Sequence, residues 1–324
     1  MAQLLKIACW DYDRINALRD GRAAIEGCDI EFTVNAPHNF FFRAGESPPF
    51  DVMEQSLSSY LTRRSRGAVP YTAIPVYPAR MFRHSAIYVR TDRIRAPADL
   101  KGKRVGVPFY GITAATTARG LLADEYGVRP EDIVWVNGGL EDPAQRLTQD
   151  LGLPNAIRIE QAERASLSQL LVEGTIDGII TAASPSTMNA PQVGRLFADY
   201  RAAEQAYFRK TRIFPIMHVI GIKTELLARD PTLALRIYRG FCEAKDVCIA
   251  DLDGDGGAVK ATVPWLGPEL AATRAVMGED FWPYGIENNR PTLEAVTRWS
   301  FEQHLSPRKL AVEELFAPET LALG

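Results

Sequence analysis

Residues 77–90 are Tyr-Pro-Ala-Arg-Met-Phe-Arg-His-Ser-Ala-Ile-Tyr-Val-Arg, and the rest of the chain is organised around them. They place Arg80, Arg83 and His84 directly before an apolar run with strand character. The planar fork of arginine matches a carboxylate, and histidine exchanges protons near neutral pH. A solvated loop with a structural histidine would explain the same residues. Their place between two blocks of strands and helices points to a functional role.

Strand and helix patterns alternate on both sides of this stretch. Before it, the sequence predicts strands over 4–10, 28–34, 50–52 and 69–76 and helices over 15–19 and 53–63. From residue 85 onward, it predicts strands over 85–90, 104–107, 133–136, 178–181 and 213–223 and helices over 113–126 and 165–173. Further helices are expected over 231–250, 268–277, 291–304 and 307–316. Such alternation is typical of parallel sheets with helices on both faces.

The alternation restarts after Pro-Ala-Asp-Leu-Lys-Gly-Lys, residues 97–103, which resembles a boundary between lobes. We therefore predict a two-lobed Venus-flytrap architecture, with 1–98 and 216–324 in lobe one and 99–215 in lobe two. In such a layout the ligand lies between the lobes, at strand ends and helix starts. The loops expected to line this cleft are 11–14, 35–45, 54–58, 77–84, 108–114, 182–187 and 214–218.

Composition describes an ordinary globular protein of 324 residues, with 46% hydrophobic and 24% charged side chains. A net charge of −3 offers no electrostatic reason to expect nucleic acid or an anionic membrane as a partner. No apolar run approaches the roughly 18 residues of a membrane span. The N-terminus lacks the pattern of a signal peptide, and four cysteines without metal-type spacing favour reduced thiols. The sequence therefore predicts a cytoplasmic protein.

Residues 109–115, Phe-Tyr-Gly-Ile-Thr-Ala-Ala, join a predicted strand to a predicted helix. Backbone N–H groups at a helix start, together with the Thr113 hydroxyl, would bind an anionic oxygen. A capped helix without a ligand explains this turn equally well. Its spacing fits neither GxGxxG nor GxxxxGK[ST], so the turn is not a nucleotide-binding loop.

The chain has four histidines, and three of them, His38, His84 and His218, fall in the predicted cleft loops. His84 and His218 each adjoin a strand where the chain is expected to cross between lobes. Each alone could be structural, but their shared placement predicts that at least one transfers a proton. Glu54 is expected at a helix start, where the helix dipole favours a carboxylate. It could instead accept a substrate hydroxyl or orient a histidine.

Several common sites are excluded by spacing. Asp-Leu-Asp-Gly-Asp-Gly, residues 251–256, copies the opening of an EF-hand loop, but Thr262 stands where the bidentate glutamate should be. The sequence contains no HExxH, no GxSxG with triad partners and no Cys–His pair at metal spacing. A serine or zinc hydrolase therefore has no support.

These motifs together resemble the 4,5-dihydroxyphthalate decarboxylase family, relatives of type II periplasmic-binding proteins and of thiamine-precursor-binding proteins. The matching segments are Asp-Tyr-Asp-Arg (11–14), Phe-Asp-Val-Met-Glu-Gln-Ser (50–56), Tyr-Pro-Ala-Arg-Met-Phe-Arg-His-Ser (77–85), Leu-Lys-Gly-Lys-Arg-Val-Gly-Val-Pro (100–108), Glu-Tyr-Gly-Val (125–128) and Ile-Phe-Pro-Ile-Met-His (213–218). The resemblance implies an α/β, two-lobed type II periplasmic-binding-protein-like fold with parallel or mixed sheets and a helical C-terminal tail.

Two places depart from the pattern expected of this family. Thr116 and Thr117 stand where a tryptophan is expected, and Arg212 stands where a small residue is more usual. Exchanging an aromatic wall for threonines would suit a different ring substituent or a different acid.

The resemblance implies non-oxidative decarboxylation of an aromatic acid with a hydroxyl para to the leaving carboxylate. Protonation of the ring carbon that bears this carboxylate gives a dienone-like intermediate, and carbon dioxide then leaves as the ring regains aromaticity. Such a site needs an acid above the ring, an acceptor at the phenol and cations for a second carboxylate. This chemistry requires no organic cofactor, and the sequence shows no dedicated metal site.

From this chemistry we assign provisional roles to the candidate residues. His84 or His218 delivers the proton, and Glu54 engages the phenolic hydroxyls together with Ser56. Arg80 and Arg83 are expected to bind carboxylate. Further substrate contacts are expected from Tyr110 and Thr113 of the opposing lobe, and from Asp11 and His38.

Two alternatives stay open at this point. A non-catalytic solute-binding protein for an aromatic or heteroaromatic carboxylate would use the same two lobes, but it predicts an export signal and needs no histidines. A sensor or a thiamine-precursor enzyme fits the distant fold but not the motifs. The partner expected in every case is a small aromatic carboxylate, and homo-oligomerisation is left open.

Overall fold

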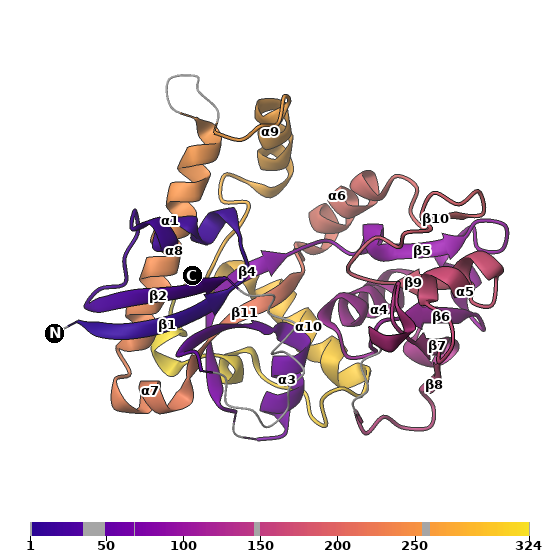
Figure 1. The fold of residues 1–324 in the computed structure, drawn as a ribbon, viewed down its shortest axis with the longest axis horizontal. Helices are drawn as coiled ribbons and strands as arrows, with labels where there is room; N and C mark the ends of the chain where they lie inside the picture. Colours follow the sequence, from indigo (N-terminus) through magenta and orange to yellow (C-terminus); the bar gives the residue numbers. More distant parts are fainter. Residues whose placement is uncertain (1, 35–48, 68, 146–149, 255–259, 324) are drawn as a thin grey trace. The chain divides into compact units, whose positions relative to one another are not determined.

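The computed structural model describes residues 2–34, 49–67, 69–145, 150–254 and 260–323 (Figure 1). The chain forms two compact units. The first contains Met1–Arg80, Ile216–Leu293 and Leu310–Gly324, and the second contains Met81–Pro215 and Glu294–Lys309. These units differ from the predicted lobes at 81–98 and 294–309, and the lobe boundaries and the cleft between lobes stay predictions.

The first unit is built on a five-stranded mixed sheet in the order β2-β1-β3-β11-β4. Its strands are β1 (Gln3–Cys9), β2 (Cys28–Val34), β3 (Val52–Ser56), β4 (Tyr71–Arg80) and β11 (Ile216–Lys223). The first three run parallel, whereas β11 is antiparallel to both of its neighbours, β3 and β4. Because β3 lies in the middle of the sheet, all five of its residues are buried.

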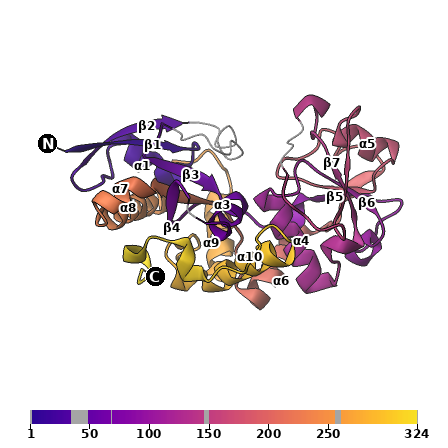
Figure 2. The same cartoon turned by 90° about the horizontal axis from the view of Figure 1, so that it is seen from below.

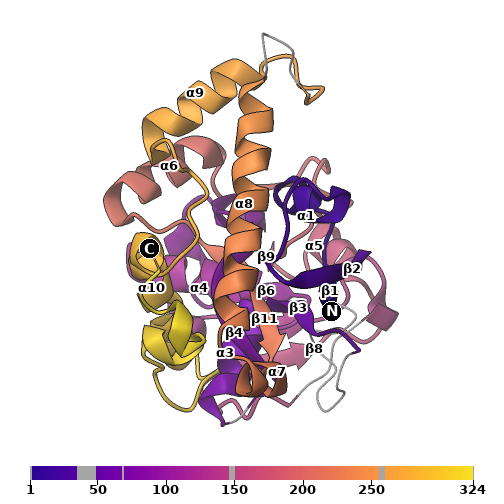
Figure 3. The same ribbon diagram turned by 90° about the vertical axis from the view of Figure 1, so that its left-hand side faces the viewer.

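The first unit also contains helices. They are α1 (Asn16–Asp20), α3 (Leu57–Ser65), α7 (Thr224–Arg229), α8 (Leu233–Asp253) and α9 (Leu266–Met277). The long helix α8 packs against α1 and β4 (Figure 3). Its buried residues Leu233, Ile237, Phe241, Ala244 and Cys248 recur at intervals of three or four, as expected for one apolar helix face.

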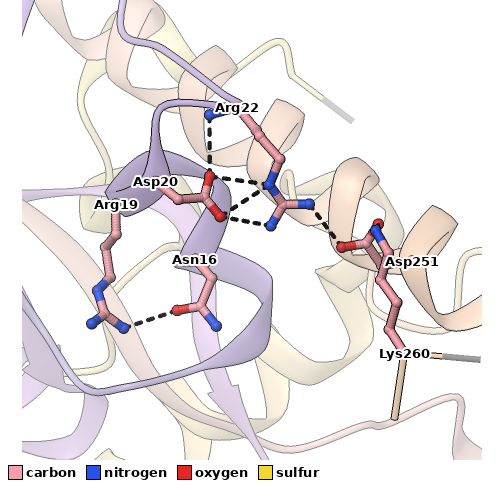
Figure 4. A network of polar contacts seen from close by, with 6 residues as sticks. All are labelled: Asn16, Arg19, Asp20, Arg22, Asp251 and Lys260. Atoms are coloured by element: carbon pink, nitrogen blue, oxygen red, sulfur yellow. Dashed lines mark hydrogen bonds and ion pairs between the residues drawn. The ribbon is translucent and has the colours of Figure 1, made fainter.

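A network of exposed charges ties the end of α1 to the last turns of α8 (Figure 4). The Arg22 guanidinium donates to Asp20 at 2.8 Å and to Asp251 at 2.8 Å. Lys260 also pairs with Asp251. Asp251 therefore binds two cationic side chains, as an ordinary acidic helix end would.

The second unit is built on a six-stranded mixed sheet in the order β10-β5-β9-β6-β7-β8. Its strands are β5 (Ile87–Arg90), β6 (Arg104–Val107), β7 (Val134–Asn137), β8 (Arg158–Gln161), β9 (Gly178–Ile180) and β10 (Val193–Arg195). Its helices are α4 (Thr113–Tyr126), α5 (Leu167–Glu173), α6 (Tyr200–Thr211) and most of α10 (Arg290–Glu302). Both α4 and α5 pack against β9. Figure 2 shows these two helices and strands β5, β6 and β7 of the unit from a second side.

Helix α4 shows how local signals and packing agree in this unit. Gly127 ends the helix with φ of 62°, and its N–H bonds the carbonyls of Ala123 and Leu122. This left-handed position is the one that glycine occupies most readily at a helix end. Within the helix, Gly120 lies against the indole of Trp299 from α10, so that a side chain at this position would overlap the ring. The two helices therefore approach closely because residue 120 has no side chain.

Two predicted helices are wrong. Residues 52–56 form β3 rather than the start of a helix over 53–63, and α3 begins only at Leu57. Glu54 therefore lies inside a sheet, where the helix-dipole argument does not apply. The expected helix over 307–316 is reduced to a 3-10 turn at Val312–Leu315. Within the described residues, no helix is long and apolar enough to cross a membrane.

Candidate active site

The polar centre of the first unit is Glu54, whose side chain is completely buried in β3. Its carboxylate accepts hydrogen bonds from the Trp10 backbone N–H at 2.8 Å, the Tyr12 hydroxyl at 2.8 Å and the Cys9 thiol at 3.2 Å. The fourth partner is Nδ1 of His218. Four donors therefore converge on one buried carboxylate.

The sheet register explains why these side chains meet. His218 of β11 lies opposite Ser56, and Ile220 lies opposite Glu54. Residues two apart in a strand share one face, so His218 is the diagonal neighbour of Glu54 on an antiparallel pair. On the other side, Ala8 of β1 lies opposite Met53, which brings the end of β1 alongside Glu54.

The hydrogen bonds decide the charge of this cluster. Burial alone would raise the pKa of Glu54, but His218 and the donors from Trp10 and Tyr12 outweigh it and lower the pKa below its usual value. Burial and the Glu54 charge raise the pKa of both the Cys9 thiol and the Tyr12 phenol. The centre therefore consists of an anionic carboxylate held by neutral thiol and phenol donors.

This charge state determines what His218 can do. An ionised carboxylate only accepts hydrogen bonds, so Nδ1 of His218 must be the donor. The ring nitrogen left to face a substrate is then Nε2. The side chain is 23% exposed, unlike that of Glu54, so it can meet a substrate. A partly exposed imidazole backed by a buried carboxylate can serve as a general acid or base.

His84 has a different environment in the second unit. It lies in a 3-10 turn, is 1% exposed, and packs edge-on against the rings of Phe197 and Tyr207. Its Nδ1 has no hydrogen-bond partner among the described residues. Burial lowers its pKa to about 4, so the ring is neutral at pH 7. A neutral, enclosed imidazole is a poor proton donor.

This lowered pKa predicts an acid-dependent loss of stability. Protonation of His84 favours the unfolded chain, whose histidine titrates near 6.5, so its penalty grows as the pH falls from 6.5 to about 4. We expect the urea midpoint of the wild-type protein to fall over this range more steeply than that of His84→Gln. The exposed His304 provides the control, His304→Gln, which should follow the wild type. Parallel curves for His84→Gln and the wild type would contradict the burial argument.

The two arginines expected to bind carboxylate are both buried, and each belongs to a different unit. Arg80 ends β4, and its Nη1 donates to the Pro283 carbonyl at 3.0 Å. Arg83 donates to the Met81 sulfur at 3.5 Å and lies near Glu204. Burial lowers the pKa of each guanidinium to about 10, so both remain charged at pH 7. Their role at the substrate stays a prediction.

Tyr110 and Thr113 lie in the second unit, where α4 begins at Thr113 as predicted. Thr113 is 4% exposed. The Tyr110 ring packs between the Arg119 guanidinium, 3.7 Å from its centroid, and Trp135. Tyr110 thus contributes to the core of this unit, and a substrate contact from either residue stays a prediction.

The three remaining candidates are Asp11, His38 and Ser56. Asp11 is exposed and pairs with Arg19. His38 lies outside the described residues. Ser56 is buried at the end of β3, opposite His218. No group of histidine, cysteine and acidic side chains in the described ranges could hold a metal ion.

The loop 11–14 was predicted to line the cleft, but Tyr12 and Arg14 were not selected as site residues, and Cys9 was missed. The available signal was their position at or just after the end of the parallel strand β1, since the carboxyl ends of such strands collect functional groups. Asp11 was selected from this turn as a substrate contact, whereas the structure directs the Tyr12 hydroxyl to Glu54.

Comparison with curated proteins identifies close relatives. The chain is 41% identical over 321 residues to a 4,5-dihydroxyphthalate decarboxylase of Comamonas testosteroni, covering 98% of this chain and 97% of the relative. It is also 41% identical over 209 residues to the protein of the same name from Pseudomonas putida, covering 63% of this chain and 81% of the relative. No protein-family model matches the sequence.

Solved structures of low sequence identity share the fold. The aliphatic sulphonate-binding protein SsuA of Escherichia coli superposes with a TM-score of 0.53 at 14% identity, covering 99% of both chains. SsuA of Xanthomonas axonopodis pv. citri, bound to MOPS, gives 0.54 at 14% identity, covering 98% of both chains. A mutant of DSZB in complex with biphenyl-2-sulfinic acid gives 0.53 at 16% identity, covering 99% of this chain and 98% of that one. The predicted type II periplasmic-binding-protein-like fold is confirmed.

Proposed function

The chain belongs to the 4,5-dihydroxyphthalate decarboxylase family, and we propose that it carries out this reaction with His218 as the proton donor and Glu54 as its partner. It is a decarboxylase of a hydroxylated phthalate and therefore a carbon–carbon lyase. The observation that supports our assignment is the contact between Nδ1 of His218 and the buried Glu54 carboxylate.

The proposed reaction begins with the protonated imidazole of His218. Its Nε2–H gives a proton to the ring carbon that bears the leaving carboxylate, and the para hydroxyl oxygen stabilises the positive charge of the ring. The bond to the carboxylate then breaks, its electron pair returns to the ring, and carbon dioxide leaves. The aromatic product keeps one carboxylate and both hydroxyls. His218 regains its proton from solvent before the next turnover.

Glu54 supports this step in two ways. By accepting from Nδ1, it holds the imidazole in the orientation and tautomer that direct Nε2 outward from the carboxylate. Its negative charge also lies directly against the ring that gives up the proton in the proposed reaction. Because Trp10, Tyr12 and Cys9 hold the carboxylate from its other sides, it is organised before substrate arrives.

Burial of the candidates favours His218 over His84 as the acid. His84 would have to gain its charge among aromatic rings, where its pKa is about 4. His218 has an anionic partner and a partly exposed ring. We further propose that Ser56, which lies opposite His218, contacts a phenolic hydroxyl.

The proposal is tested with purified wild-type protein and three compounds. We expect 4,5-dihydroxyphthalate to release one equivalent of carbon dioxide, measured by mass spectrometry, and to form 3,4-dihydroxybenzoate, measured by liquid chromatography. Phthalate, which lacks the para oxygen, should bind without reacting, and 3,4-dihydroxybenzoate should act only as a product inhibitor. Tight binding of 4,5-dihydroxyphthalate without carbon dioxide release would instead identify a solute-binding protein.

A cytoplasmic location also belongs to this proposal. All four cysteines are free thiols in the structure, which suits a reducing compartment. Neither a nucleic acid nor a membrane is needed as a partner for the reaction.

A further inference from the structure

We propose that Arg14 binds the carboxylate that the substrate retains, and so selects an aromatic acid with two adjacent carboxylates. This inference rests on the proposed function, because it concerns the same site. Four features of Arg14 support it. Arg14 lies near Glu54, it contacts the strand beside His218, aromatic rings hold its guanidinium in place, and one nitrogen of that guanidinium can still donate to a ligand.

A single aromatic ring separates Arg14 from the polar centre. Its Cζ lies 4.3 Å from the centroid of the Tyr12 ring. The hydroxyl of the same ring donates to Glu54 at 2.8 Å. Glu54 in turn contacts His218. The guanidinium charge therefore lies within the width of one side chain of the proposed catalytic pair.

A second contact places Arg14 beside His218 independently. Its Nε donates to the Pro78 carbonyl of β4 at 2.6 Å. The next residue, Ala79, lies opposite His218 in the sheet. Arg14 thus contacts β4 one residue away from the position opposite His218. A small ligand in contact with the imidazole would therefore be within reach of the guanidinium.

The guanidinium is rigidly supported. It contacts two aromatic faces, because its Cζ is also 4.2 Å from the centroid of the Trp282 ring. The Trp282 indole N–H is fixed by the Tyr77 carbonyl at 3.0 Å. Aromatic faces attract a cation and order a side chain that would otherwise lose entropy on binding. Arg14 is therefore held in place before a ligand arrives.

The donors of Arg14 leave capacity for a carboxylate. Nη1 donates to Asp13 at 2.8 Å, and Nη2 has no acceptor among the described residues. The Arg14 side chain is 16% exposed, and that of Asp13 is 61% exposed. An incoming carboxylate can bind Nη2, or it can displace Asp13 from Nη1. The displaced Asp13 carboxylate would then be solvated by water, because its side chain is exposed. Arg80 is less accessible to a ligand, since it is only 6% exposed.

The reaction itself determines which carboxylate Arg14 should hold. Binding a cation to the leaving carboxylate would stabilise the reactant more than the transition state, in which that charge disappears, and would slow the reaction. The adjacent carboxylate keeps its charge throughout, so an arginine there anchors the ring without opposing the chemistry. Arg14 is thus expected to contribute to binding nearly equally in both states.

The test compares Arg14→Gln, Arg14→Lys and the control Arg274→Gln. Arg274 also lies over an aromatic ring and pairs with an aspartate, but it belongs to α9. We expect Arg14→Gln to raise KM for 4,5-dihydroxyphthalate by about 10- to 100-fold, the value of one charged hydrogen bond, with kcat changed less than about threefold. In calorimetry with unreactive ligands, Arg14→Gln should abolish the preference for phthalate over benzoate. Arg14→Lys should be intermediate, and Arg274→Gln should match the wild type.

The outcomes separate this inference from the proposed function. An unchanged KM and an unchanged preference for phthalate in a folded Arg14→Gln protein would overturn the inference while leaving the decarboxylase intact. A wild type that binds phthalate through Arg14 but releases no carbon dioxide would overturn the proposed function alone. If Arg14→Gln fails to fold, as judged by its thermal midpoint, Arg14→Lys decides, and a wild-type KM in that variant overturns the inference.

Discussion

His218→Gln is expected to lower kcat for 4,5-dihydroxyphthalate by about 10²- to 10⁴-fold, the usual contribution of a positioned general acid. Glutamine retains a hydrogen-bonding group toward Glu54 but cannot deliver a proton at neutral pH. Because the lost interaction belongs to the chemical step, kcat and kcat/KM should fall together. Steady-state kinetics at pH 7, with the product measured by liquid chromatography, provide the readout.

The matched control is the same substitution at the second candidate, His84→Gln. His84 is enclosed by Phe197 and Tyr207 and is neutral at pH 7, so its loss should affect stability rather than the chemical step. We expect kcat within about threefold of wild type at a temperature where the variant is folded. The reverse result, a large loss at His84 with little change at His218, would transfer the acid role to the second unit.

Glu54→Gln is expected to have the second largest effect on kcat, and it should also lower the stability of the folded protein. Glu54 accepts from Trp10, Tyr12, Cys9 and His218. A glutamine replaces one accepting oxygen by an NH₂ group, which must then face a donor inside the protein. An unsatisfied buried donor costs about 1–3 kcal/mol, and the imidazole loses its anionic partner. We expect kcat to fall by at least about 100-fold in the protein that remains folded.

The stability effect of Glu54 has a predicted pH dependence. Because the pKa of Glu54 is lower in the folded protein than the usual 4.5, its ionised form stabilises the fold above that value. This contribution is lost as the pH falls below 4.5 through the folded-state pKa. Urea unfolding should therefore show the wild type clearly more stable than Glu54→Gln at pH 7, with the difference narrowing below pH 4.5.

Glu141 of the second unit offers a matched control for both measurements. Its carboxylate accepts from the Ser168 hydroxyl at 2.7 Å and from Ser186, and its pKa is also lowered. Glu141→Gln should thus change stability with pH in the same direction but leave kcat near the wild-type value. A stability difference for Glu54→Gln that does not narrow in acid would contradict an ionised Glu54 in the fold.

Elements with local signals were predicted well. The bounds of β2 (Cys28–Val34), β6 (Arg104–Val107) and α4 (Thr113–Tyr126) agree with the sequence predictions at both ends. Each is bounded by residues that favour a turn or a cap in isolation, such as Gly127 after α4. Short strands without such signals, β8 (Arg158–Gln161) and β10 (Val193–Arg195), were missed.

The error at residues 53–63 has a physical cause. Met-Glu-Gln-Ser-Leu carries good helix formers, so local propensity predicts a helix. In the folded chain, residues 52–56 pair with β1 on one side and β11 on the other. The hydrogen bonds of a central strand outweigh this local preference, and those on one side come from β11, which lies far along the chain.

By itself, the sequence determined the fold class, the family and the residue types of the site, because strand and helix periodicity, turn residues and ordered motifs are local properties. Only the tertiary structure decided which of these residues act together. Glu54 and His218 are 164 positions apart, and they meet because β3 and β11 are antiparallel neighbours in one register. The tertiary structure also decided the environment of each histidine. Burial among aromatic rings keeps His84 neutral, whereas the sheet places His218 against the Glu54 carboxylate. Charge and proton transfer depend on that environment, which no stretch of sequence contains.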